Sequence, residues 1–216
     1  MELYLIRHAE IAGDPHRHYQ PPVEGCLSEQ GMRQAAALAE ALEGVTFDAI
    51  YASPLGRAIQ TAQALAGPRD LGIEVLDWLI EWRPATVLGE CDDASFEKIM
   101  AEAEKRRPEQ SWKTPAGEGT LQMAHRIIVG FTELMARYGV HGGHGGYLLD
   151  NPDDTRRIAL VAHGGSLNAL LGLVLNLPIR PFGYFAFEHT GVAVVELLRR
   201  IDVWYPTLKL RPPAPL

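Results

Sequence analysis

Short runs of apolar and β-branched residues alternate along this chain with longer segments in which apolar residues recur at helical spacing. The short runs predict strands at 3–6, 47–52, 73–76 and 157–162, and one or two closing strands at 192–198 and 201–210. The longer segments predict helices that begin at 28, 53, 120 and 166, and an amphipathic surface helix over 92–107. This alternation is typical of an α/β fold built on a mainly parallel sheet.

Local signals at the ends of the elements support this order. Ser53 and Pro54 suit the N-cap and the first position of the second helix. Thr120 suits the N-cap of a later helix with a strongly apolar face. The segments 12–25 and 140–154 are rich in Gly, Pro, His and Asp, so both are predicted to be loops.

Composition places the chain among ordinary globular proteins. Its 216 residues are 47% hydrophobic and 22% charged, which suffices for one domain whose core needs no disulfide. Cys26 and Cys91 lack a paired spacing, so we expect reduced thiols in a cytoplasmic protein. We expect no targeting segment, and the apolar stretch 158–177 is interrupted by polar residues, so no membrane span is predicted.

The acidic charge balance limits the possible partners. A formal net charge of −7 argues against nucleic acid or an anionic membrane surface, so any bound anion must be held by a few placed cations. Such residues follow three predicted strands: Arg7-His8, then Arg57, then His163-Gly164. Because ligands collect at the carboxyl ends of parallel strands, we expect these residues to converge on one phosphate pocket.

Each of these residues also has an ordinary structural interpretation. A histidine after a strand is usually a hydrogen-bonded structural residue, an arginine early in a helix is usually solvated, and a Gly-Gly pair usually forms a turn. Their coincidence at three strand ends of an acidic chain favours the pocket. The turn at Gly165 would add helix N-terminal N–H groups as anion donors.

Four sequence motifs occur in order along the chain, at 5–10, 27–35, 52–62 and 161–165. With weaker pairs at 117–118 and 189–190, they resemble the ordered motifs of the histidine phosphatase superfamily, in its phosphoglycerate mutase-like branch. The resemblance implies a three-layer α/β/α sandwich with a mainly parallel mixed sheet. It also implies a single domain over 1–216 with a small lid around 83–119.

The resemblance further implies covalent catalysis without a metal or other cofactor. His8 would attack phosphorus through one ring nitrogen and form a phosphohistidine that water then hydrolyses. The phosphoryl group would be surrounded by Arg7, Arg57, His163 and Gly164. Because the imidazole must attack in its neutral form, its other nitrogen should be held by a backbone carbonyl or a similar acceptor.

A general acid must protonate the leaving alcohol, and the resemblance implies Glu81 for this role. Trp78 and Trp82 flank it in sequence, and rings packed around the carboxyl group would favour the protonated form that an acid needs. Asp77 and Glu90 are rival candidates. The sequence departs from the family here, since Trp82-Arg83-Pro84 stands where a glycine is usual.

These features predict a histidine acid phosphatase-type phosphoric monoester hydrolase that acts on a small phosphorylated metabolite. One alternative is a phosphoglycerate-type phosphomutase, which would need a more closed lid than 83–119 offers. The other is a non-catalytic phospho-ligand binding module, which would need neither a nucleophile nor a proton donor. The substrate itself stays open.

Some residues could extend the site or the assembly. Arg17 in the loop 12–25 could contact a second anionic group of the substrate, or be a solvated cation. His141 and His144 lie in a glycine-rich segment without further ligands, so no metal site is predicted. An exposed closing strand near the C-terminus would allow a homodimer.

Overall fold

The computed structural model describes most of the chain. The residues it describes are 1–13, 27–67, 71–89, 91–105, 111–143, 145–178 and 184–209. The predictions made for Arg17, Cys26, Glu90 and His144 lie outside these residues.

One mixed sheet of eight strands forms the centre of the molecule, in the order β3-β2-β8-β1-β9-β10-β7-β6. Its first four strands are parallel: β3 (Ile73–Val75), β2 (Ala49–Ala52), β8 (Arg157–Ala162) and β1 (Glu2–Arg7). The other four are antiparallel to their neighbours: β9 (Val192–Arg200), β10 (Val203–Lys209), β7 (Gly146–Leu149) and β6 (Val140–Gly143). The parallel half contains all the strands whose ends carry the predicted site.

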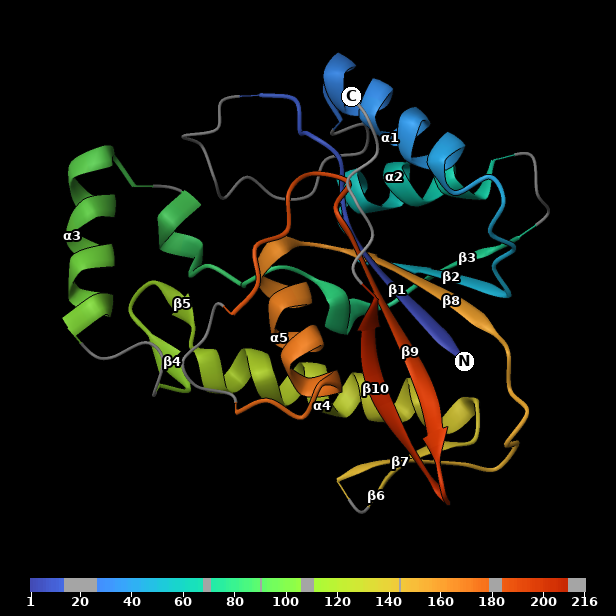
Figure 1. The fold of residues 1–216 in the computed structure, drawn as a ribbon. Coiled ribbons are helices and arrows are strands. Elements are labelled where there is room, and N and C mark those ends of the chain that lie inside the picture. The colour runs from blue at the N-terminus through green and yellow to red at the C-terminus, as the bar shows by residue number, and fades with distance from the viewer. Residues whose placement is uncertain are drawn as a thin grey trace.

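Helices cover both faces of the sheet. Their bounds are α1 (Glu29–Ala41), α2 (Gly56–Ala66), α3 (Asp93–Lys105), α4 (Thr120–Arg137) and α5 (Gly164–Val174), with short 3-10 helices η1 (Asp77–Leu79) and η2 (Thr86–Gly89). Figure 1 shows α1 and α2 on one side of the sheet and α4 and α5 on the other. The three-layer α/β/α sandwich is therefore confirmed.

The alternation of side chains along β1 explains the three layers. Leu3 and Leu5 belong to the core shared with α4 and α5, while Tyr4 and Ile6 belong to the core shared with α1 and α2. All four side chains are at most 1% exposed. A strand buried on both faces reads as a continuous apolar run, which is why the sequence 3–6 predicts it so clearly.

The start of α2 differs from the prediction. The helix begins at Gly56 with Leu55 at its N-cap, so Ser53 and Pro54 precede it. Ser53 is fully buried, and its Oγ lies 2.7 Å from Nε2 of His163. The hydroxyl of Ser53 therefore contacts the histidine that follows the neighbouring strand β8 and does not cap the helix. Two smaller differences concern α4, which has Gly119 rather than Thr120 as N-cap, and α5, which begins at Gly164.

The segment 140–154 is not a loop throughout, contrary to the prediction. It forms the β6–β7 hairpin, which joins the sheet where Tyr147 pairs with Trp204 of β10. Val140, Tyr147 and Leu149 are buried in the core beside α4 and α5. This burial favours strands here, because the hairpin removes from water apolar side chains that a solvated loop would expose.

The segment 83–119 stands apart from the sheet and carries α3 at the far left of Figure 1. Pro84 bridges to Gly117, and β4 (Lys113–Thr114) pairs with β5 (Gly117–Glu118). A small apolar cluster sits beneath α3, with Leu88, Ala103 and Ala116 buried. The amphipathic helix predicted over 92–107 is confirmed. Its role as part of a lid stays a prediction.

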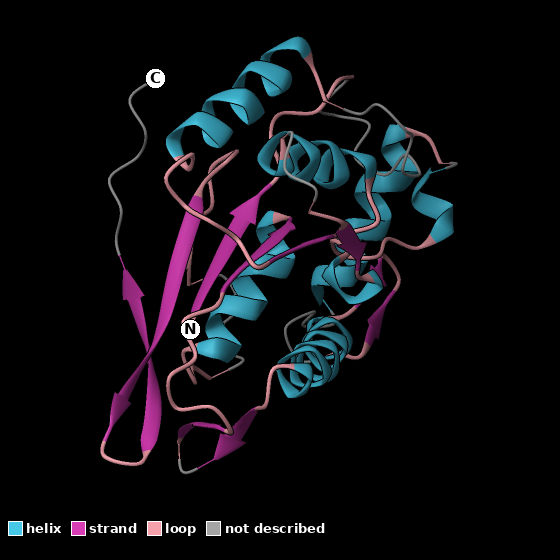
Figure 2. Ribbon diagram, turned by 90° about the vertical axis from the view of Figure 1, so that its right-hand side faces the viewer, coloured by secondary structure: helices cyan, strands magenta, loops and turns pink. Residues whose placement is uncertain are grey.

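The two closing strands are confirmed as β9 and β10. Figure 2 shows the long β9–β10 pair extending from the body of the sheet. Strand β10 pairs with β9 along its whole length but with β7 only at Trp204, so, among the described residues, 205–209 have no strand on that side. The homodimer stays a prediction. Among the described residues, no helix is long and apolar enough to cross a membrane.

Candidate active site

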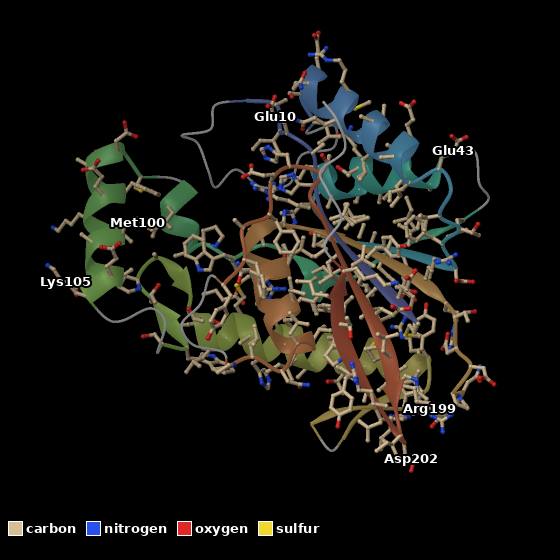
Figure 3. The ribbon with its side chains drawn as sticks, in the orientation of Figure 1. Glu10, Glu43, Met100, Lys105, Arg199 and Asp202 are labelled. Atoms are coloured by element: carbon tan, nitrogen blue, oxygen red, sulfur yellow. The ribbon has the colours of Figure 1, made fainter. Side chains whose placement is uncertain are left out.

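Three parallel strands bring the predicted site residues together. His8 follows β1, His163 follows β8, and Arg57 lies in the first turn of α2 after β2. The rings of His8 and His163 are 4.9 Å apart between centroids, and Nε of Arg57 donates to Nδ1 of His163 at 3.2 Å. Residues far apart in sequence therefore form one cluster at the carboxyl ends of the strands, as predicted. In Figure 3 this end of β1 lies toward the labelled Glu10.

The imidazole of His8 is held in one tautomer. Its Nδ1 lies 2.7 Å from the carbonyl oxygen of Ala9, and because a carbonyl only accepts, Nδ1 carries the proton. Nε2 therefore keeps its lone pair. Burial first, and then the charges of Arg57 and Arg7, lower the pKa of His8 to about 3 despite the Ala9 hydrogen bond. The predicted backbone carbonyl and neutral imidazole are both present.

A neutral His8 has a consequence for pH dependence. We expect nitrogen-detected NMR to show the Nδ1–H tautomer of His8 unchanged from about pH 8 to about pH 5, because its folded pKa is about 3 and the ordinary value is 6.5. Below pH 6.5 the imidazole of His8 binds a proton in the unfolded chain but not in the folded one. This group therefore lowers the free energy of unfolding by up to about 1.4 kcal/mol per pH unit as the pH falls toward the folded pKa. A His8 resonance titrating near the ordinary value would contradict this.

His163 is the most enclosed histidine of the cluster. Its Nδ1 accepts from Arg57, so Nε2 carries the proton and donates to Oγ of Ser53. Burial lowers the pKa of His163 well below its usual range, and the neighbouring His8, Arg57 and Arg7 lower it further. His163 thus holds Arg57 in place as a neutral acceptor, and the positive charge of the cluster resides on arginine.

Arg7 presents an unsatisfied donor to the same cluster. One guanidinium nitrogen donates to the carbonyl of Phe187, and another lies 3.4 Å from Nε2 of His189. Its Nε is buried and has no hydrogen-bond partner among the described residues. Gly164, the first residue of α5, lies beside it, because a Cβ there would be 3.8 Å from this Nε. Buried N–H groups of this kind are normally paired, and an anion would satisfy it.

The sequence indicated His189 only as part of a weak motif, yet it belongs to the cluster. Its ring centroid is 5.6 Å from that of His8. Burial lowers the pKa of His189, and the charge of Arg7 adds to this, while Glu10 and Glu188 oppose it. Its nearness to Arg7 and His8 depends on the turn at 189–190, in the irregular segment that precedes β9. Local sequence patterns do not predict this turn.

Thr61 connects α2 to the segment that carries His8. Its hydroxyl accepts from the backbone N–H of Ala9 at 3.1 Å and donates to the carbonyl of Arg57 at 2.8 Å. Thr61 is fully buried. The motif at 52–62 thus contains both the arginine that contacts His163 and the residue that fixes the chain next to His8.

Glu81 reaches the first turn of α5, beside His163. Its Oε2 accepts from the N–H of Gly165 at 3.0 Å, and its Oε1 accepts from the N–H groups of Ser166 at 3.2 Å and Trp82 at 2.9 Å. A Cβ on Gly165 would lie 2.5 Å from Oε1, so glycine is needed for this approach. The polar contacts of the carboxylate are backbone N–H groups, rather than the apolar enclosure expected from the flanking tryptophans. Asp77, the rival candidate, is exposed in η1.

Arg126 of α4 fixes the segment that carries Glu81, and the sequence analysis missed it. Its guanidinium binds both carboxylate oxygens of Glu118, at 2.7 and 2.8 Å. It also donates to the carbonyls of Trp78 at 2.6 Å and of Glu81 at 3.1 Å. Such a planar bidentate pair holds its partners in one geometry. The weak motif at 117–118 was a signal for Glu118, but its partner could only be found through the fold.

No cluster of three His, Cys, Asp or Glu side chains suited to a metal ion occurs in the part of the chain that the structure describes. His141 contacts Asp150 at 3.5 Å in the β6–β7 region. The cluster around His8 carries the guanidinium groups of Arg7 and Arg57, which are groups that can pair with an anion.

Comparisons with known proteins agree with this geometry. The model of the histidine phosphatase superfamily (branch 1) matches residues 3–201, so the chain belongs to that superfamily. It is 26% identical over 203 residues to phosphoserine phosphatase 1 of Hydrogenobacter thermophilus, covering 94% of this chain and 90% of that protein. It is 27% identical over 185 residues to a probable phosphoglycerate mutase of Proteus mirabilis, covering 82% and 76%.

The fold also matches a solved structure. The mycobacterial glucosyl-3-phosphoglycerate phosphatase in complex with VO3 has a TM-score of 0.73 and 26% identity, over 97% of this chain and 98% of that one. The resemblance drawn from the four motifs is therefore confirmed. The chain is an enzyme with the phosphatase-type activity of its superfamily.

Proposed function

We propose that the protein is a metal-independent phosphomonoesterase that hydrolyses small phosphate esters through a phosphohistidine on His8. The observation that carries this proposal is the fixed tautomer of His8, whose Nδ1–H is bound to Ala9 and whose Nε2 keeps its lone pair. A buried, neutral imidazole beside two arginines is suited to attack a phosphorus atom held by those arginines.

The reaction has two steps. The Nε2 lone pair of His8 attacks phosphorus while the bond from phosphorus to the leaving oxygen breaks, and Glu81 gives that oxygen a proton. Water then attacks the phosphohistidine, the phosphorus–nitrogen bond breaks, and Glu81 takes the proton that water releases. Neutral His8, protonated Glu81 and inorganic phosphate result, so protons and electron pairs balance over the cycle.

The charge of the transferring phosphoryl group is met by guanidinium groups. Because His8, His163 and His189 all have lowered pKa values, Arg7 and Arg57 supply the positive charge of the cluster. The unpartnered Nε–H of Arg7 supports a role in binding phosphate oxygen, and the N-terminus of α5 at Gly164 adds a favourable dipole.

Hydrolysis is preferred over the two alternatives. A binding module would need no lone pair on His8 and no carboxylate delivered to the α5 N-terminus. A phosphomutase would need to exclude water from the intermediate, and the segment 83–119 is modest for this purpose.

Turnover of para-nitrophenyl phosphate in excess chelator tests the proposal. We expect the purified protein to release nitrophenol at an unchanged rate when the chelator is added, because the transferring charge is met by Arg7 and Arg57. Added glycerol should divert little of the phosphoryl group into glycerol phosphate. A folded protein without turnover supports the binding module, and activity that needs an added metal ion overturns the metal-independent mechanism.

A further inference from the structure

A cavity of about 290 Å³ lies between the segment 83–119 and the starts of α4 and α5. Its walls come from α3 on one side, from the β4–β5 hairpin on another, and from the core below. In Figure 3 the labelled Met100 of α3 points from the outlying segment toward the body of the molecule. Wall residues that matter here are Trp82, Met100, Ala103, Met123 and Gly165.

The cavity adjoins the proposed proton donor. Gly165 and Trp82 both line it, and the backbone N–H of each donates to the carboxylate of Glu81, at 3.0 and 2.9 Å. A leaving oxygen protonated by Glu81 would therefore carry its organic group toward this cavity. Gly164, the residue before Gly165, adjoins the cluster, because a Cβ on it would lie 3.8 Å from Nε of Arg7.

The walls have a definite chemical character. Two thioethers and an indole ring form much of the lining, from Met100, Met123 and Trp82. The indole N–H of Trp82 donates to the carbonyl of Glu118, which fixes the ring as a wall. Sulfur and indole surfaces of this kind favour contact with aromatic and alicyclic groups.

The charges at the cavity oppose an anionic occupant. Glu104 and Glu118 line it, and no cationic side chain does so among the described residues. The carboxylate of Glu118 is bound by Arg126, so that arginine is already committed. A substrate carboxylate would lose its solvent there and would find no uncommitted cation among the described lining residues, while Glu104 adds a negative charge.

We infer that this cavity binds the leaving group of the substrate, and that this group is an uncharged alcohol with an aromatic or alicyclic body. The inference rests on the proposed phosphatase function and adds a substrate class to it. It separates this chain from enzymes whose phosphate esters carry a carboxylate. A volume near 300 Å³ is at the small end of ligand sites and suits a group of one or two rings.

Two esters of similar primary alcohols test the substrate class without a difference in leaving-group chemistry. We expect kcat/KM for 2-phenylethyl phosphate to exceed that for 3-phosphooxypropanoate by at least about tenfold. Choline phosphate is the third arm, because acidic walls could instead favour a cation. Preference for the carboxylate ester or for choline phosphate overturns the assignment.

Filling the cavity tests the location. Ala103→Phe should lower kcat/KM for 2-phenylethyl phosphate by about tenfold or more. The kcat/KM for ethyl phosphate, whose leaving group is too small to need the cavity, should stay nearly unchanged. The matched control is Ala101→Phe, the same change at an exposed position of α3. Met100→Lys should raise kcat/KM for 3-phosphooxypropanoate relative to kcat/KM for 2-phenylethyl phosphate, because it adds a cation to the cavity wall. Equal effects of the two phenylalanine variants on both esters overturn the location.

The wild-type comparison stands even where a variant does not fold. If wild-type protein hydrolyses no ester, para-nitrophenyl phosphate included, the proposed function fails and the substrate class fails with it. If it hydrolyses para-nitrophenyl phosphate but does not prefer the phenyl ester, the substrate class alone fails.

Discussion

Replacing His8 with alanine is expected to lower kcat for para-nitrophenyl phosphate by at least about 10⁴-fold, because the bond to phosphorus then has no nucleophile to form it. Arg7 and Arg57 remain, so the variant should still bind inorganic phosphate. Steady-state kinetics together with calorimetric phosphate binding would measure both effects.

The control for this variant is His125→Ala, which removes an exposed histidine from α4. It should behave as wild type. Circular dichroism and thermal unfolding would show whether His8→Ala keeps the fold, since His8 is only 6% exposed and its removal leaves a space. Folded His8→Ala protein with more than a few per cent of wild-type activity would exclude His8 as the nucleophile.

Replacing Glu81 with glutamine is expected to lower kcat/KM by about 10² to 10⁴ for alkyl phosphates and far less for para-nitrophenyl phosphate. An alkoxide is a poor leaving group that needs a proton, whereas nitrophenolate leaves readily without one. A series of esters with graded leaving groups would measure this as a steeper dependence of rate on leaving-group basicity. Glutamine keeps the shape of the side chain and one of the two oxygens that accept backbone N–H groups, while its amide nitrogen cannot accept one.

The matched control is Asp77→Asn, since Asp77 is the rival acid in the same stretch of chain but is exposed in η1. It should change neither the rates nor their dependence on the leaving group. The role of Glu81 is wrong if Asp77→Asn reproduces the loss, or if Glu81→Gln slows phenolic and alkyl esters equally.

The parallel half of the fold could be predicted because its determinants are local. The run 3–6 is apolar without interruption, so it predicts a strand buried on both faces, and β1 spans it. The helical segments between the strands then predict that the strands are parallel, as β3, β2, β8 and β1 are. His8, Arg57 and His163 could be placed together for the same reason, because each follows the end of such a strand.

The remaining features depend on partners that are distant in sequence. Ser53 has the local chemistry of an N-cap, but its contact with His163, 110 positions away, decides its place. Arg126 reads as one polar residue on an amphipathic helix until the fold brings the carbonyls of Trp78 and Glu81 to it. Such contacts are not encoded in local periodicity.

Positive and negative side chains are separated at the proposed site. With its three histidines neutral, the cluster relies on Arg7 and Arg57 for positive charge. Beyond Gly165 the neighbouring cavity carries Glu104 and Glu118. Phosphate and leaving group are thus expected to occupy two compartments of opposite character, joined at the first turn of α5.

Trapping the phosphorylated enzyme is the most direct test of covalent catalysis by His8. The protein would be mixed with para-nitrophenyl phosphate, quenched within a turnover in alkali, where phosphohistidine is stable, and mapped by mass spectrometry. The proposed mechanism predicts a phosphoryl group on His8, formed by wild-type protein and absent from His8→Ala. Rapid turnover with no phosphoenzyme, or a phosphoryl group on another residue, would contradict it.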